Sequence, residues 1–177
     1  MRKRFLLFLL LFLVNPVTFA NGPSFGVYSN ARYNYALEYP LFLVPQGESE
    51  NGDGEKFIGN EGELTVYGSF LPTLDSQKNQ DKFNIEEEFN YEKKQLKQEG
   101  FELDYAYLSK NIFVISGTSY TQIVYLKKIF VPSCSIHLYL WLYYPKTEKK
   151  QWDLWVTKIS KSFKYKSKKC QGDFIRN

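Results

Sequence analysis

The stretch Glu48–Phe57, ESENGDGEKF, holds the residues of this sequence whose types and spacing could bind a metal ion. It resembles the first half of an EF-hand calcium loop, which needs oxygen ligands at positions 1, 3, 5 and 12 and glycine at position 6. With Gly54 as position 6, the first three ligand positions are polar: Ser49, Asn51 and Asp53. Position 12 is then Asn60, where a bidentate glutamate is required.

The flanks of this stretch also differ from those of an EF-hand, because strands and not helices are expected on both sides. Asn-Gly and Asp-Gly are favoured turn dipeptides, since both residue types tolerate a positive φ. We therefore predict that Asn51–Gly54 is a structural turn and not a high-affinity calcium site. The alternative is a cation site, and its oxygen ligands would come from three carboxylates: Asp53, Glu55 and Glu61.

Other catalytic chemistry has little support in the sequence. His137 is the only histidine, so no histidine cluster for zinc can form, and it is predicted to be structural. On a strand it would face away from Cys134, three residues earlier, which argues against a Cys–His pair. Serine-nucleophile and phosphate-loop motifs are missing. Four glutamates could act as paired glycosidase carboxylates, although a solvated helix face is preferred: Glu86, Glu87, Glu88 and Glu92. No catalytic residue and no cofactor are predicted.

An aromatic stripe is the remaining candidate for a binding site. Tyr139, Trp141 and Tyr143 alternate along one strand, and His137 shares their face, with Ile136, Leu138 and Leu140 on the other. Together with Tyr105 and Tyr107 on a nearby strand, the stripe could line a surface for a carbohydrate, a peptide or a hydrophobic ligand. The preferred interpretation is sheet core under a helix, because aromatic residues on both faces indicate that both faces are covered.

The first twenty residues have the three parts of a secretory signal. A basic start is followed by the apolar run Phe5–Val14, and Thr18-Phe19-Ala20 ends the segment with small residues at the cleavage positions. The run is about half the ~20 residues of a membrane span. We predict cleavage after Ala20 and a periplasmic or secreted bacterial protein with no membrane span after cleavage.

Removal of this segment changes the charge balance. Three of the 23 basic residues would leave with it, so 20 basic residues remain against 19 acidic ones and the formal charge of +4 becomes +1. A nucleic-acid partner therefore has no overall electrostatic support. The lysine-rich stretch Lys158–Lys169 is interpreted as a solvated face and chain end, with a polyanion site as the alternative.

The chain has two cysteines, Cys134 and Cys170. In an oxidising compartment a pair of cysteines indicates a disulfide. This bridge would close a loop of about 37 residues and stabilise by about 4 kcal/mol on the chain-entropy model. Two unpaired thiols are the alternative.

Hydrophobic periodicity predicts six strands and two helices in residues 21–177, which have the length of one domain. The strands are expected at residues 33–39, 64–70, 101–107, 112–118, 122–131 and 135–144, with a polar loop from Pro45 to about Gly54. The first helix is expected over Asn84–Glu99, with Asn84 as N-cap and Gly100 after its end. The second is capped by Thr147 and has an apolar stripe: Trp152, Trp155, Val156, Ile159 and Phe163.

The resulting order, ββ-α-ββββ-α, predicts an α+β domain with a mostly antiparallel sheet of about six strands covered by two helices. The segments RYNYALEYP, NGDGEKF and EGELTVYGSF, and the final helix with its Trp and Phe residues, resemble the PsbP-like α/β/α sandwich, which includes periplasmic DcrB-type proteins. This resemblance implies an accessory or binding module and carries over no catalytic residue.

We therefore expect an exported, non-catalytic protein that binds a protein or a small ligand in the cell envelope. Two alternatives stay open. One is a periplasmic immunity or inhibitor protein, and the other is a small hydrolase whose site the sequence does not identify.

Overall fold

The computed structural model describes residues 23–71, 83–166 and 170. The predicted signal segment 1–20 lies outside these residues, as do the polar segment 74–82 and Lys168 and Lys169.

Within the described part of the chain, ten strands and two α-helices follow one another. They are β1 (Phe25–Asn30), β2 (Tyr35–Pro40), β3 (Val44–Glu48), β4 (Gly54–Gly59), β5 (Gly62–Phe70), α1 (Ile85–Gln98), β6 (Glu102–Leu108), β7 (Ile112–Thr118), β8 (Gln122–Val131), β9 (Ile136–Pro145), α2 (Lys149–Ser162) and β10 (Lys164–Tyr165).

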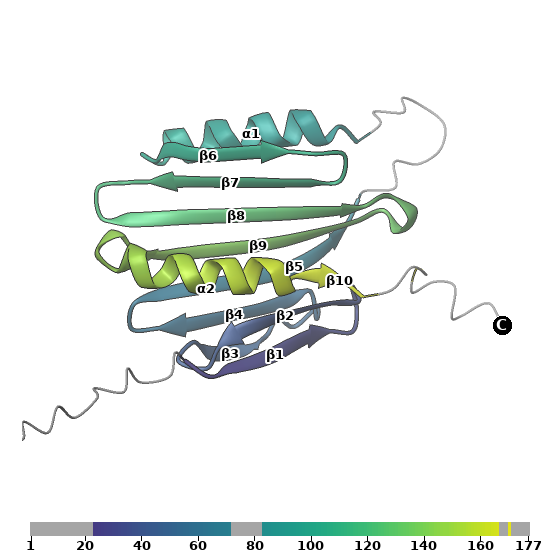
Figure 1. Ribbon diagram of the computed structural model, residues 1–177. Helices are drawn as coiled ribbons and strands as arrows, with labels where there is room; N and C mark the ends of the chain where they lie inside the picture. Colours follow the sequence, from purple (N-terminus) through teal and green to yellow (C-terminus); the bar gives the residue numbers. More distant parts are fainter. Residues whose placement is uncertain (1–22, 72–82, 167–169, 171–177) are drawn as a thin grey trace, which may run out of the picture.

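A seven-stranded antiparallel sheet forms the middle layer, in the order β3-β4-β5-β9-β8-β7-β6 (Figure 1). Strand β9 lies at its centre, between β5 and β8. The chain reaches β9 only after α1 and three further strands, so the pairing of β5 with β9 joins segments far apart in the sequence. This pairing places Tyr67 directly opposite Tyr139.

Helix α2 and a small sheet of order β1-β2-β10 cover one face of the large sheet, where the main core lies (Figure 1). This core contains the predicted apolar stripe of α2, all of it buried: Trp152, Trp155, Val156, Ile159 and Phe163. From the large sheet it receives one face of β9, namely Ile136, Leu138, Leu140, Leu142 and Tyr144.

Helix α1 lies on the opposite face and covers only the half of the sheet around β6, β7 and β8 (Figure 1). Its buried residues Phe89 and Leu96 pack on Phe113 and Ile115 of β7 and on β8. The part of this face formed by β4 and β5 has no described helix over it, and β9 lies at the border, where Trp141 and Tyr143 pack against the core under α1. This asymmetry decides which side chains are available for binding.

The ends of α1 confirm the predicted caps. The Asn84 side chain accepts hydrogen bonds from the backbone of Glu86 at 2.9 Å and Glu87 at 3.4 Å, and it donates one to the Glu87 carboxylate at 3.0 Å. At the other end, Gly100 has φ +89° and donates to the Lys97 carbonyl, while the next residue bonds the Leu96 carbonyl. This is a Schellman motif, whose left-handed position favours glycine.

The predicted N-cap of α2 is wrong. Thr147 lies inside a 3₁₀ turn (Lys146–Glu148), which follows Pro145 and delays the start of the helix to Lys149. The N-cap is Glu148, and its side chain makes no capping bond.

The α+β class, the two helices and the mostly antiparallel sheet are confirmed, although the main sheet has seven strands and a second sheet of three is present. The predicted loop from Pro45 to about Gly54 is wrong in its first part, because residues up to Glu48 belong to β3. This edge strand is exposed along its whole length, so it shows no alternation of apolar and polar residues.

Candidate functional site

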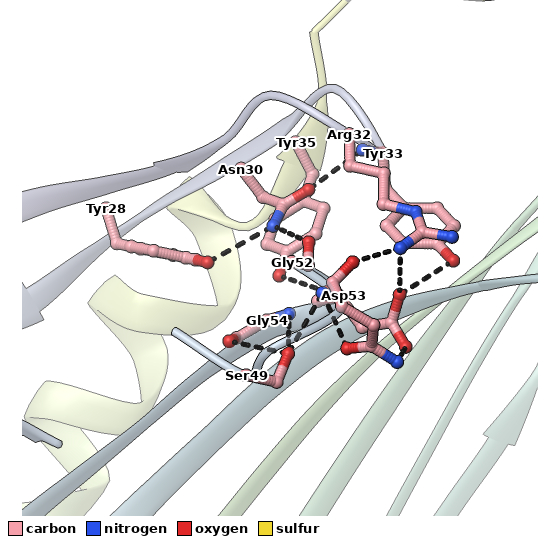
Figure 2. A network of polar contacts seen from close by, with 10 residues as sticks. Tyr28, Asn30, Arg32, Tyr33, Tyr35, Ser49, Gly52, Asp53 and Gly54 are labelled. Atoms are coloured by element: carbon pink, nitrogen blue, oxygen red, sulfur yellow. Dashed lines mark hydrogen bonds and ion pairs between the residues drawn. The ribbon is translucent and has the colours of Figure 1, made fainter. Parts of the chain in front are cut away.

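The turn between β3 and β4 is held by its own backbone and by Ser49 (Figure 2). Gly52 has φ +68° and its N–H donates to the Ser49 carbonyl at 2.7 Å. The Ser49 hydroxyl accepts hydrogen bonds from the backbone N–H groups of Asp53 at 3.0 Å and Gly54 at 3.3 Å. Asn51–Gly54 therefore forms the turn that its Asn-Gly and Asp-Gly dipeptides predict.

The Asp53 carboxylate faces the β1–β2 hairpin and is surrounded by protein donors (Figure 2). The Tyr33 hydroxyl donates to Oδ1 at 3.0 Å, the Asn51 amide donates to Oδ2 at 2.5 Å, and Arg32 Nη1 lies 3.4 Å from Oδ1. Asn30 adds a hydrogen bond of 2.9 Å to the Gly52 carbonyl. These contacts tie the turn to the small sheet, which is a structural role.

The three carboxylates named as cation ligands are not brought together. Asp53 precedes β4, Glu55 is buried on the core side of that strand, and Glu61 lies in the turn at the other end of β4. Among the described residues, no group of three or more His, Cys, Asp or Glu side chains could hold a metal ion. That Asn51–Gly54 does not bind calcium tightly stays a prediction.

The predicted disulfide is confirmed. The sulfurs of Cys134 and Cys170 are bonded, 2.10 Å apart, and tie the chain after β10 to the turn between β8 and β9. Cys134 lies in a 3₁₀ turn (Pro132–Cys134) and not on β9, so the argument from strand faces does not apply to it. The disulfide itself excludes a thiol–histidine pair.

Titratable side chains do converge beneath the first turn of α1. Lys128 of β8 is fully buried, and its ammonium forms an ion pair with Glu88 of α1. The ammonium also donates a hydrogen bond of 2.7 Å to the Tyr139 hydroxyl, and His137 Nδ1 lies 3.4 Å from the same oxygen. Phe83 lies 4.3 Å from the His137 ring, centroid to centroid. The predicted solvated face is therefore wrong for Glu88, although Glu86 and Glu87 are exposed.

Burial sets the protonation of this cluster. It lowers the pKa of Lys128 to about 7 and raises that of Tyr139 to about 12. Burial and then the Lys128 charge lower the pKa of His137 to about 3, so this histidine is neutral at pH 7. Its Nε2 atom has no hydrogen-bond partner among the described residues. Because Lys128 and His137 are sealed from solvent, the cluster holds α1 on the sheet and offers no open reaction site.

The predicted aromatic stripe lies on the α1 side of β9, at the border of the part of the sheet that α1 covers. We call Tyr67, Tyr139, Trp141 and Tyr143 the aromatic face. Tyr67 and Tyr139 stack with ring centroids 4.5 Å apart, and Trp141 and Tyr143 are nearly parallel with centroids 6.0 Å apart. All four rings are half-buried. The preferred interpretation, core under a helix, holds in part. Trp141 and Tyr143 pack against the core under α1, and the Tyr139 hydroxyl donates to Glu88 of that helix at 3.4 Å, but all three rings keep an exposed part.

Two of the predicted members of this surface lie elsewhere. Tyr105 and Tyr107 of β6 are half-exposed, but their register partners are Ser116 and Val114, which face the α2 side. A bulge between Leu103 and Tyr105 shifts the register there. Strands β7 and β8 also separate β6 from β9.

Carboxylates border the aromatic face. The sequence analysis named Glu92 only as a possible glycosidase carboxylate on a solvated helix face, and it did not name Glu63 or Glu99. Burial raises the pKa of Tyr143 to about 12, and the negative charges of Glu99, Glu63 and Glu92 add to this effect. Burial likewise raises the pKa values of Tyr67 and Tyr139, and the negative charge of Glu92 adds a smaller contribution to both. Glu63 is paired with Lys56 at 2.8 Å. For Glu92, the sequence did contain a sign of this position. It lies three residues after Phe89 and four before Leu96, and this spacing puts it on the sheet side of α1.

An open hollow of about 500 Å³ adjoins the Tyr143 end of the face. Its lining includes Glu61, Glu63 and Tyr143. The site is thus a set of half-buried rings with carboxylates beside them.

Comparison with known proteins identifies the fold. No protein-family model matches the chain, and no curated protein matches its sequence. Cyanobacterial PsbP (CyanoP) from Synechocystis sp. PCC 6803 has a similar structure, with a TM-score of 0.59 and 12% identity over 86% of this chain and 98% of that one. The Ran-binding protein Mog1p of Saccharomyces cerevisiae gives a TM-score of 0.56 and 9% identity over 81% of this chain and 96% of that one.

A Mog1 mutant gives the same TM-score of 0.56, with 9% identity over 82% of this chain and 97% of that one. The chain therefore has the PsbP-like fold, and the predicted resemblance is confirmed at that level. At these identities the likeness concerns the fold alone.

Proposed function

We propose that this protein is an exported, non-catalytic binding module and that the aromatic face is its binding surface. The observation that carries the proposal is a group of four neighbouring rings on the α1 side of the sheet, at the border of the part that α1 covers, all of which stay only half-buried. Tyrosine and tryptophan are enriched in binding surfaces because they bury large areas at low entropic cost.

The export part of the proposal is supported by the disulfide, which is typical of oxidising compartments. No helix in the described residues is long and apolar enough to cross a membrane. Signal cleavage after Ala20 remains a prediction. One structural relative is described as a Ran-binding protein, which supports a protein partner by analogy only.

The hydrolase alternative depends on the buried cluster of Glu88, Lys128, His137 and Tyr139. A reaction site needs titratable groups that a substrate can reach. The side chains of Lys128 and His137 are only 1% and 5% exposed. The cluster thus favours binding over catalysis. An immunity or inhibitor role is one form of protein binding and is included in the test.

The test is site-specific photo-crosslinking of the mature protein in an envelope extract. A photoreactive amino acid replaces Thr65, which pairs with Trp141 and shares its side of the sheet. The control position is Tyr107 on the opposite side. A discrete product from position 65, absent from position 107 and lost in the Tyr67→Ala variant, is the expected result. Equal products from both positions, or none from position 65, would overturn the proposal.

A further inference from the structure

We propose that the aromatic face binds a basic segment of a protein partner, and that Glu92 and Glu99 of α1 are the counter-charges for its lysine or arginine side chains. This inference builds on the proposed function and names the chemistry of the partner. It begins with the place of these two carboxylates on the helix.

Glu92 lies on the stripe of α1 that turns toward the sheet. It follows Phe89 by three residues and precedes Leu96 by four, and both of these neighbours are buried. Glu99 follows seven residues after Glu92, about 10 Å along the helix axis. Their charges act on the hydroxyls of the aromatic face, as the pKa of Tyr143 shows.

Neither carboxylate has a cationic partner among the described residues, whereas their neighbours do. Glu88 is paired with Lys128, and Glu63 with Lys56. Lys93, on the next position of α1, has its ammonium 4.3 Å from the centroid of the Phe89 ring. The other lysines of α1, Lys94 and Lys97, line a separate hollow with Asn90 and Gln98.

Both carboxylates are placed against local preference. Burial raises the pKa of Glu92 above its usual range, and the negative charge of Glu99 raises it further. Glu99 is the C-cap residue, at the negative end of the helix dipole, where a carboxylate is unfavourable. A cation bound beside each carboxylate would relieve these effects. Residues that cost stability in the free protein are typical of binding sites.

The rings of Tyr67, Trp141 and Tyr143 add a second attraction for a cation, whereas the Tyr139 ring already has the Lys128 ammonium 4.1 Å from its centroid. The faces of tyrosine and tryptophan attract ammonium and guanidinium groups by about 0.5–2 kcal/mol, most strongly where water is excluded. A charge-assisted hydrogen bond to a carboxylate is stronger than a neutral one. Because the two carboxylates stand about 10 Å apart, a small amine would meet one of them. A chain with two or more basic residues can meet both, so a protein segment is the better fit.

The experiment uses a fluorescent octapeptide of alternating lysine and serine, with a glutamate–serine octapeptide and a neutral oligosaccharide as comparison ligands. Fluorescence anisotropy measures binding to the mature protein at low salt. The double variant E92Q/E99Q is compared with E86Q/E102Q, which removes the same charge from two exposed glutamates away from the aromatic face.

The expected result is that the lysine peptide binds the wild type and that E92Q/E99Q raises Kd about tenfold, equivalent to about 1.4 kcal/mol. E86Q/E102Q should change Kd less than about twofold, because exposed distant charges are screened. The melting temperature of E92Q/E99Q should be unchanged or higher, since both carboxylates are unfavourable in the free protein. A structural role would instead lower it.

Four outcomes would overturn the inference: no binding of the lysine peptide, equal loss in both double variants, preference for the glutamate peptide or the oligosaccharide, or self-association that E92Q/E99Q abolishes. The last would assign the face to a second copy of this chain. Loss of the Thr65 crosslink in Tyr67→Ala, with binding intact in E92Q/E99Q, would leave the proposed function standing without this inference.

Discussion

At the scale of single residues, Lys128 has an unusual environment. Its side chain is 1% exposed, and its counter-charge Glu88, on α1, is 22% exposed. Removing one member of a buried ion pair leaves the other without compensation, and the cost depends on whether the remaining charge can reach water. Loss of Glu88 therefore leaves an ammonium that is sealed from water, whereas loss of Lys128 leaves a carboxylate that water can reach.

We predict that Glu88→Ala costs about 3–5 kcal/mol of unfolding free energy, because it leaves a buried ammonium unpaired. Lys128→Met should cost about 1 kcal/mol, since the remaining Glu88 can be hydrated and the methionine fills the space. Urea denaturation at pH 7 measures both, with the exposed Glu86→Ala as control.

The pH dependence of stability identifies why Glu88→Ala lowers the free energy of unfolding. Burial lowers the pKa of Lys128 below its ordinary value of 10.5. Between the two values the unfolded chain binds more protons than the folded one, so stability rises with pH. Loss of Glu88 lowers this pKa further, so the deficit of Glu88→Ala should shrink as pH rises through about 7 and then stay constant, because Lys128 is neutral in both folded proteins at higher pH. Equal costs for the two substitutions, or a deficit independent of pH, would contradict this account.

At the scale of elements, α2 joins the two sheets. Its apolar residues contact both of them, and Phe42 before β3 stacks on Trp155 with centroids 4.6 Å apart. The C-cap residue Phe163 meets Tyr35 of β2 edge to face, with centroids 5.8 Å apart. The small sheet is thus held mainly through this helix.

We predict that Trp155→Ala and Phe163→Ala each cost about 3–5 kcal/mol, as expected for a large aromatic side chain lost from a core. Lys158→Ala should cost well under 1 kcal/mol, although its ammonium lies 3.2 Å from Glu38, because both side chains are nearly half exposed. Thermal and urea unfolding of the three variants measure this contrast. Aromatic variants that unfold like the wild type would show that the stripe does not carry the fold.

At the scale of the whole molecule, the many buried tyrosines make stability sensitive to alkali. Burial raises the pKa values of Tyr28, Tyr139 and Tyr143 to about 12, from an ordinary value of 10.0. Burial also raises the pKa values of Tyr35 and Tyr144. Above pH 10 the unfolded chain loses protons that the folded chain keeps, so each of these groups lowers stability as pH rises.

We predict that the free energy of unfolding falls steeply between about pH 10 and pH 12. Phenolate absorbance should rise in one step together with the loss of tertiary circular dichroism, because these groups titrate only on unfolding. Full titration of all tyrosines in a protein that is still folded would contradict the prediction.

Local sequence patterns were sufficient for the elements whose signal lies within a few residues. Asn84 and Gly100 mark the ends of α1 because capping bonds join near neighbours in the chain. The apolar stripe of α2 and the alternation along β9 were also predicted, since burial on one face of a helix or strand repeats with its period. The disulfide followed from the count of two cysteines.

The tertiary structure decided the edge strands, the pairing order and the composition of the site. Strand β3 exists because β4 pairs with it, and an exposed edge carries no period. Tyr105 and Tyr107 do not lie on the predicted surface. The register of β6 against β7 determines which face of the sheet each side chain is on, and hydrogen bonds between residues distant in the sequence set that register. Glu92 and Glu99 border the aromatic face only because α1 packs on the sheet, and that packing depends on contacts between residues distant in the sequence.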